Sequence, residues 1–123
     1  MSNEQLEQVE ALEAASPYCE KMIKAISRII KEYSGEKLPD TDDYMHSILK
    51  GMHWIFSVYD GTKSLINAGG VVIDENEVNK SVIRLNDANK AEDDSERVEA
   101  FKGLLKFVET FKTEADGIIA KAA

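Results

Sequence analysis

The two histidines of the chain stand seven residues apart in the stretch YMHSILKGMHWIFSVYDG, and they are the first candidates for metal chemistry. Zinc needs donor atoms about 2 Å from the ion, and a helix supplies such donors from positions three or four apart. Residues seven apart lie about 10.5 Å from each other along a helix axis. His46 and His53 therefore cannot bind one ion together, and no good ligand stands three or four positions from His53. We interpret both as solvated histidines at the border of a polar helix face and expect no metal or cofactor at them.

Acidic pairs three residues apart offer a second kind of chemistry. Such pairs occur at Glu10 and Glu13 and at Asp40 and Asp43, and carboxylates are the oxygen ligands that Mg²⁺ prefers. In this spacing the chain resembles the all-helical, magnesium-dependent nucleotide pyrophosphohydrolases, and the resemblance implies an enzyme that holds Mg²⁺ with these four carboxylates. With 23 acidic residues in the chain, pairs of this kind also arise without a function on solvated helix faces. The enzyme is therefore the alternative hypothesis.

Composition and charge limit the number of domains, the classes of partner and the cellular location. A chain of 123 residues with 43% apolar residues has the size and balance of one globular domain, which we place at residues 1–123. A net charge of −8 opposes binding to nucleic acid or to an anionic membrane, because phosphates are bound by clustered Lys and Arg. The single cysteine, Cys19, cannot form an internal disulfide, and the first ten residues lack the pattern of a signal peptide,. These features predict a cytoplasmic protein.

The first half of the chain shows helical periodicity in two long segments. Apolar residues at seven-residue spacing continue through Pro17, which predicts one helix from about residue 4 to 34 that is bent or briefly broken near Ser16. A second helix is predicted to begin after Pro39, with Asp40 or Thr41 as its cap, and to end at Ala68, before two glycines,.

The second half of the chain predicts two further helices. Asp74 can cap a third helix that carries Val78, Val82 and Leu85,. A fourth helix is predicted, with its cap near Asp94 or Ser95. Its apolar face comprises Val98, Phe101, Leu104, Leu105, Val108, Phe111, Ala115, Ile118 and Ile119. No segment has the pattern of a β-strand, and short connections favour antiparallel neighbours. The sequence therefore predicts an all-α, antiparallel up-down four-helix bundle.

More apolar helical surface is present than a minimal bundle needs. The second helix carries a second apolar face opposite its main stripe, and the early part of the first helix adds three more positions,. The six residues of this extra surface are Trp54, Val58, Leu65, Leu6, Val9 and Leu12. They predict a non-enzymatic interaction module, a homodimer or a small adaptor or chaperone for another protein, with Trp54 as an anchor of the contact. The alternative places Trp54 inside a monomer, under the first helix or the GGVVID loop.

A known class of proteins shares this plan. In being small, acidic and four-helical, the chain is similar to bacterial export and assembly chaperones such as the flagellin secretion chaperone. The resemblance covers size and architecture, and it implies a protein partner. Because one fold hosts many functions, the similarity supports the interaction hypothesis only by analogy.

Overall fold

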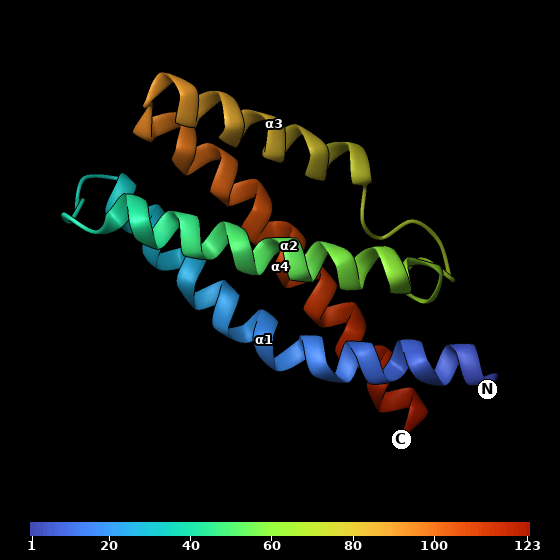
Figure 1. Ribbon diagram of the computed structural model, residues 1–123. Helices are drawn as coiled ribbons and strands as arrows, with labels where there is room; N and C mark the ends of the chain where they lie inside the picture. The colour runs from blue at the N-terminus through green and yellow to red at the C-terminus, as the bar shows by residue number, and fades with distance from the viewer.

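The computed structural model describes all 123 residues and consists of four helices joined by short loops. Figure 1 shows them running up and down in sequence order, so the predicted all-α four-helix bundle is confirmed. The helices are α1 (Asn3–Tyr33), α2 (Thr41–Ile66), α3 (Glu75–Ala91) and α4 (Asp94–Ala122). None of them combines the length and the apolar character that a membrane crossing requires.

The long helices α1 and α4 form the central pair of the bundle. α2 packs mainly on α1 and touches α4 over a shorter stretch, whereas α3 packs on α4 alone. The backbones of α2 and α3 do not contact each other, and Figure 1 shows α4 crossing obliquely behind α2. The bundle is therefore closed along three seams and open along the fourth.

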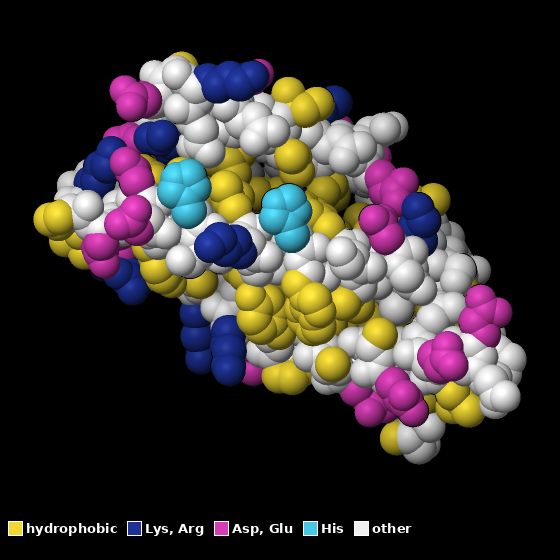
Figure 2. Space-filling model, in the orientation of Figure 1, with side chains coloured by type: hydrophobic (Ala, Val, Ile, Leu, Met, Phe, Trp, Pro, Cys, Tyr) yellow, Lys and Arg dark blue, Asp and Glu magenta, His cyan; other side chains and the backbone are white.

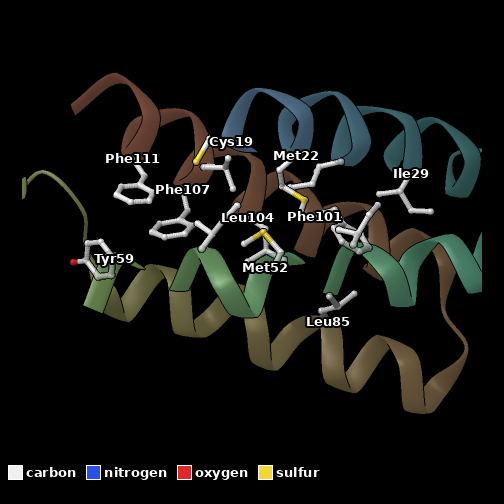
Figure 3. Packing of buried hydrophobic residues seen from close by; sticks show 14 of the residues in the cluster. Cys19, Met22, Ile29, Met52, Tyr59, Leu85, Phe101, Leu104, Phe107 and Phe111 are labelled. Atoms are coloured by element: carbon white, nitrogen blue, oxygen red, sulfur yellow. The ribbon is translucent and has the colours of Figure 1, made fainter. Parts of the chain in front are cut away.

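The core lies where α1, α2 and α4 meet, and the close-up in Figure 3 shows residues of all four helices converging on it. On α1, Leu12, Cys19 and Ile26 are fully buried one heptad apart. On α4 the fully buried positions are Phe101, Val108 and Phe111. Burying a Leu or Phe side chain contributes about 1.5–3 kcal/mol, so this one seam accounts for a large share of the stability of the fold.

Pro17 lies inside a continuous α1, as the periodicity predicted. Proline has no N–H to donate to the carbonyl four residues earlier, and its ring pushes that turn apart. Figure 1 shows the axis of α1 changing direction near its middle. The bend lets both halves of α1 follow the surface of α4. Next to the proline, the hydroxyl of Ser16 donates a hydrogen bond to Asp116 of α4.

The helix boundaries follow local capping, and they differ from the prediction at the start of α4 and at the end of α2. Asp74 caps α3 as predicted, by accepting a hydrogen bond from the N–H of Asn76. The cap of α4 is Asp93, one residue before the predicted Asp94 or Ser95, because its carboxylate accepts a hydrogen bond from the N–H of Glu96 at 3.2 Å. α2 ends at Ile66 instead of the predicted Ala68, three residues before the first glycine of the pair.

The start of α2 is held by the end of α1. Asp40 occupies the N-cap of α2 without a side-chain hydrogen bond. Instead, the hydroxyl of Thr41 accepts from the N–H of Leu38 at 2.8 Å and donates to the carboxylate of Glu32 at 2.6 Å. Arg28 donates to the same carboxylate at 2.6 Å. The buried Glu32 is therefore fully partnered, and it fixes the turn between the two helices.

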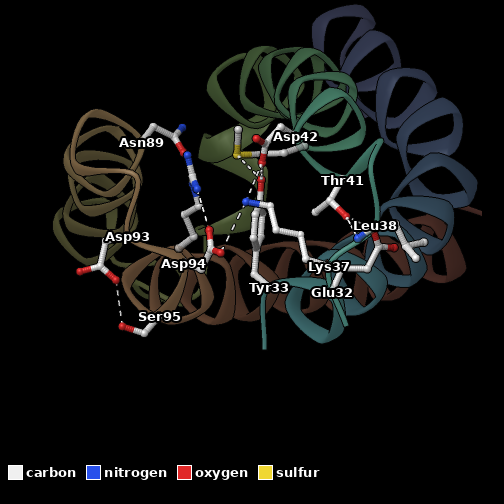
Figure 4. A network of polar contacts seen from close by, with 12 residues as sticks. Glu32, Tyr33, Lys37, Leu38, Thr41, Asp42, Asn89, Asp93, Asp94 and Ser95 are labelled. Atoms are coloured by element: carbon white, nitrogen blue, oxygen red, sulfur yellow. Dashed lines mark hydrogen bonds and ion pairs between the residues drawn. The ribbon is translucent and has the colours of Figure 1, made fainter. Parts of the chain in front are cut away.

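A polar network ties this end of the bundle together (Figure 4). The phenol of Tyr33 donates to Asp42 at 2.7 Å. The guanidinium of Arg97, only 6% exposed, donates to Asn89 and Asp94, each at 2.7 Å, and lies 5.1 Å from the centre of the Tyr33 ring. The network joins the α1–α2 loop to the α3–α4 loop. Because each of its charged groups has a partner, no buried charge is left unpaired.

These contacts predict a loss of stability in acid. Hydrogen bonds from Thr41 and Arg28 lower the pKa of Glu32, and the bond from Tyr33 lowers the pKa of Asp42. A carboxyl whose pKa is lower in the folded state binds more protons when unfolded, so its contribution is present above the unfolded pKa and is lost as pH falls through the folded pKa. We expect the melting temperature to fall as pH drops below about 4.5, the ordinary value for Glu, and Glu32→Gln to make this fall smaller. An unchanged pH slope in that variant contradicts this account of the α1–α2 turn.

Candidate interaction surface

The outer surface formed by α1 and α2, which we call the α1–α2 face, carries the most prominent exposed aromatic residue. Trp54 is 42% exposed, and its ring meets that of Tyr18 on α1 edge to face, with centroids 5.1 Å apart at 85°. Figure 2 shows apolar side chains gathered on this part of the surface, below α2. Trp54 therefore lies beside α1 and not under it, and a substantial part of its ring remains in water.

Gly51 makes this arrangement possible. It lies one turn before Trp54 on α2 and is buried against α1. A Cβ atom at this position would collide with the hydroxyl of Tyr18 and the terminal methyl of Met22. The absence of a side chain thus lets Tyr18 lie across α2 with its ring against the tryptophan.

Two hollows flank the apolar centre of the α1–α2 face. The first, which we call the Gly61 hollow, has a volume of about 470 Å³. It is lined by Glu4, Glu7, Gln8, Ala11, Ser57, Val58, Gly61 and Thr62. A Cβ at Gly61 would meet no atom within 4 Å, so the glycine leaves this hollow open. The second hollow, of about 410 Å³, lies beside Trp54 and is lined by Tyr18, Ser47, Lys50, Gly51 and Trp54.

The six residues predicted to form an interface divide into three groups. Leu6 and Trp54 are exposed, at 47% and 42%. Val58 and Leu65 are half-buried. Val9 and Leu12 are buried, at 4% and 0% exposed, because Leu12 belongs to the same inward stripe of α1 as Cys19. The apolar surface open to a partner is thus smaller than the sequence predicted, and it is centred on Trp54.

The open seam between α2 and α3 is a feature that the sequence did not predict. It contains a cleft of about 440 Å³. Phe107 forms part of its lining, 5.3 Å from Phe56 and 5.6 Å from Tyr59 between ring centroids. Phe107 was missing from the predicted face of the fourth helix because it lies at the edge of that stripe. In Figure 2 both histidines stand along the rim of the seam; His46 and His53 are exposed, in accordance with our interpretation of them as solvated residues.

The four carboxylates of the alternative enzyme hypothesis do not form one site. Glu10 and Glu13 lie in the first half of α1, whereas Asp40 and Asp43 lie at the start of α2, next to the end of α1. Nineteen residues separate Glu13 from Glu32, the α1 residue bound to Thr41, which corresponds to about 28 Å of helix. Nowhere in the structure do three or more His, Cys, Asp or Glu residues come together in a group able to hold a metal ion.

The single thiol is a core residue. Cys19 is fully buried between α1 and α4, and desolvation raises its pKa to about 11. Because the thiolate is the reactive form of cysteine, a raised pKa together with burial keeps this side chain inert at neutral pH.

The fold and this surface define the chain as an all-α bundle with an exposed aromatic face and no clustered metal ligands. The chain belongs to the family described as a domain of unknown function, DUF8042, whose model matches residues 10–114. The match includes all of α2 and α3 and most of α1 and α4. Neither the curated proteins nor the solved structures contain a match to the chain.

A substitution at Gly51 tests how the exposed aromatic pair is held. We expect Gly51→Val to displace Tyr18 and to lower the free energy of unfolding by about 1–3 kcal/mol, the usual cost of overpacking. Because Trp54 is the only tryptophan, its fluorescence reports the displacement directly as a red-shifted emission. Gly117→Val on α4 is the matched control, since a Cβ there meets no atom within 4 Å. Equal emission spectra for the two variants would show that Gly51 does not position the pair.

Proposed function

We propose that the protein is a non-enzymatic interaction module, a small adaptor or chaperone-like protein that associates with itself through the α1–α2 face. The single observation that supports this proposal most directly is the exposed Trp54, whose ring meets that of Tyr18 edge to face. The pairing holds the indole ring in one orientation, so little conformational entropy remains to be lost when a partner covers it.

The energetics of tryptophan favour an interface over an exposed ring. A tryptophan side chain has one of the largest apolar areas of any residue, and such residues carry much of the binding energy of protein interfaces. Trp54 keeps 42% of its surface in water, and the half-buried Val58 stands one turn further along α2. A partner that covers both gains hydrophobic burial without having to rearrange the bundle.

The net charge of the chain and its single buried cysteine are consistent with a protein partner in the cytoplasm. A net charge of −8 disfavours nucleic acid and anionic membranes. Cys19 has no disulfide partner and is buried, as suits a reducing compartment. No group of side chains able to hold a metal ion stands near the α1–α2 face.

Removal of the indole ring tests this proposal. We expect the wild type to form a dimer that dissociates on dilution. Trp54→Ala should raise the dissociation constant of this dimer at least tenfold, as for an interface hot spot. The measurement is solution mass by light scattering on a size-exclusion column over a dilution series, with circular dichroism to confirm that the bundle is intact. Ile83→Ala, at a 59% exposed position on α3, is the matched control and should leave the dimer unchanged. A wild type that is monomeric at every concentration, or a dimer indifferent to Trp54, refutes self-association through this face.

A further inference from the structure

We infer that the partner on the α1–α2 face is a second copy of this chain, docked antiparallel about a two-fold axis, with Trp54 of each copy in the Gly61 hollow of the other. This inference rests on the proposed self-association and adds its geometry. It follows from two independent properties of the face, the placement of a projection and a hollow and the placement of its charges.

The projection and the hollow have the spacing that a two-fold axis requires. In a two-fold interface the same patch serves both copies, so a projecting side chain and its receiving hollow lie on opposite sides of the axis. Trp54 and Gly61 are seven residues apart on α2, and so on one side of the helix about 10.5 Å apart along it. An axis midway between them passes at Ser57 and Val58, both of which line the Gly61 hollow.

Residues of α1 continue the same pattern. Tyr18 supports Trp54 on one side of the midpoint, whereas Gln8 and Ala11 line the Gly61 hollow on the other. The side chain of Ser64 lies 3.4 Å from that of Gln8, which places the start of α1 beside the end of α2. The aromatic half of the face therefore lies opposite a half that contains the Gly61 hollow.

The charges of the face are separated in the same way. Glu4 and Glu7 line the Gly61 hollow, and Lys50 lines the hollow beside Trp54. Lys21 follows Tyr18 by one turn of α1 and is exposed. Figure 2 shows Lys and Arg side chains directly to the lower left of the apolar patch and Asp and Glu side chains to its right, with further Asp and Glu at the left end of the molecule.

These charged residues lack partners within the chain. Glu4, Glu7, Lys21 and Lys50 take part in none of its ten ion pairs. An antiparallel two-fold arrangement places the basic end of each copy over the acidic end of the other, twice per dimer. A parallel arrangement would place like charges together. In a chain of net charge −8, whose copies repel each other at a distance, this complementarity specifies both the partner and its orientation.

The size of the face suits such a dimer. Glu4 and Lys21 are seventeen residues apart, which corresponds to about 25 Å of helix. Two helices side by side, each about 10 Å across, give a face of about 500 Å², below the roughly 800 Å² that each partner contributes to a typical specific interface, as expected for a dimer that dissociates on dilution.

Charge reversal gives a test that a merely structural role cannot imitate. We expect Lys21→Glu/Lys50→Glu and Glu4→Lys/Glu7→Lys each to weaken self-association at least tenfold, because each puts like charges over one another at both ends. Mixed in equal amounts, the two variants should form a heterodimer at least as tight as the wild type, since opposite charges then meet at both ends. Light scattering of the separate and mixed variants at low salt reads this out. Failure of the mixture to associate, or full association of either variant alone, overturns the antiparallel arrangement.

Filling the hollow gives a second test. Gly61→Leu adds a side chain where nothing in the monomer stands in its way, and leucine is a better helix former than glycine. We expect the variant to fold at least as stably as the wild type while its dimer dissociates at a concentration at least tenfold higher. Gly117→Leu, at the other exposed helical glycine with open space around it, should leave the dimer unchanged.

The outcomes separate this inference from the proposed function. A dimer that is lost in Trp54→Ala but unaffected in Gly61→Leu, or that fails the charge-exchange test, keeps self-association through the face and refutes this two-fold geometry. A wild type that never dimerises refutes both proposals.

Discussion

The pairing of α1 with α4 is the interaction on which the rest of the structure depends. Fully buried residues from both helices, among them Leu12 and Ile26 of α1 and Phe101 and Phe111 of α4, form one continuous apolar seam. Removal of one such Phe side chain typically costs about 3–5 kcal/mol, a large part of the roughly 5–15 kcal/mol by which domains are stable. The bend at Pro17 and the bond from Ser16 to Asp116 fit α1 to its partner along its length.

The two shorter helices then attach to different members of this pair. α2 packs on α1 across Gly51 and α3 packs on α4, so α2 and α3 do not meet. Each flank of α2 is left with apolar side chains near the surface: Phe56 toward the open seam and Trp54 on the α1–α2 face. The second apolar face of α2 is thus a consequence of the packing, and the polar network around Arg97 holds the bundle end in place without covering either flank.

Helical periodicity was sufficient to predict the four helices, the continuity of α1 through Pro17 and the inward stripes of α1, α2 and α4. Local capping was less predictable, because several Asp and Ser residues near the start of α4 compete for one position and Asp93 makes the bond. The exposure of individual interface residues was not predictable either. Leu12 and Trp54 are both apolar residues on helices, and only the crossing of α1, α2 and α4 decides that one is buried and the other half open. The cleft beside Phe107 required the missing α2–α3 contact, which no sequence pattern contains.

The most direct measurement for the central claim, that the α1–α2 face binds a second copy about a two-fold axis, is disulfide cross-linking at the axis itself. Ser57 is exposed and lies midway between Trp54 and Gly61, and the native thiol of Cys19 is buried, so Ser57→Cys introduces one accessible thiol per chain. The account predicts that mild oxidation converts this variant rapidly to a covalent dimer, and that adding Trp54→Ala abolishes the reaction. Cross-linking no faster than that of Asn86→Cys, at an exposed position on α3, would contradict it.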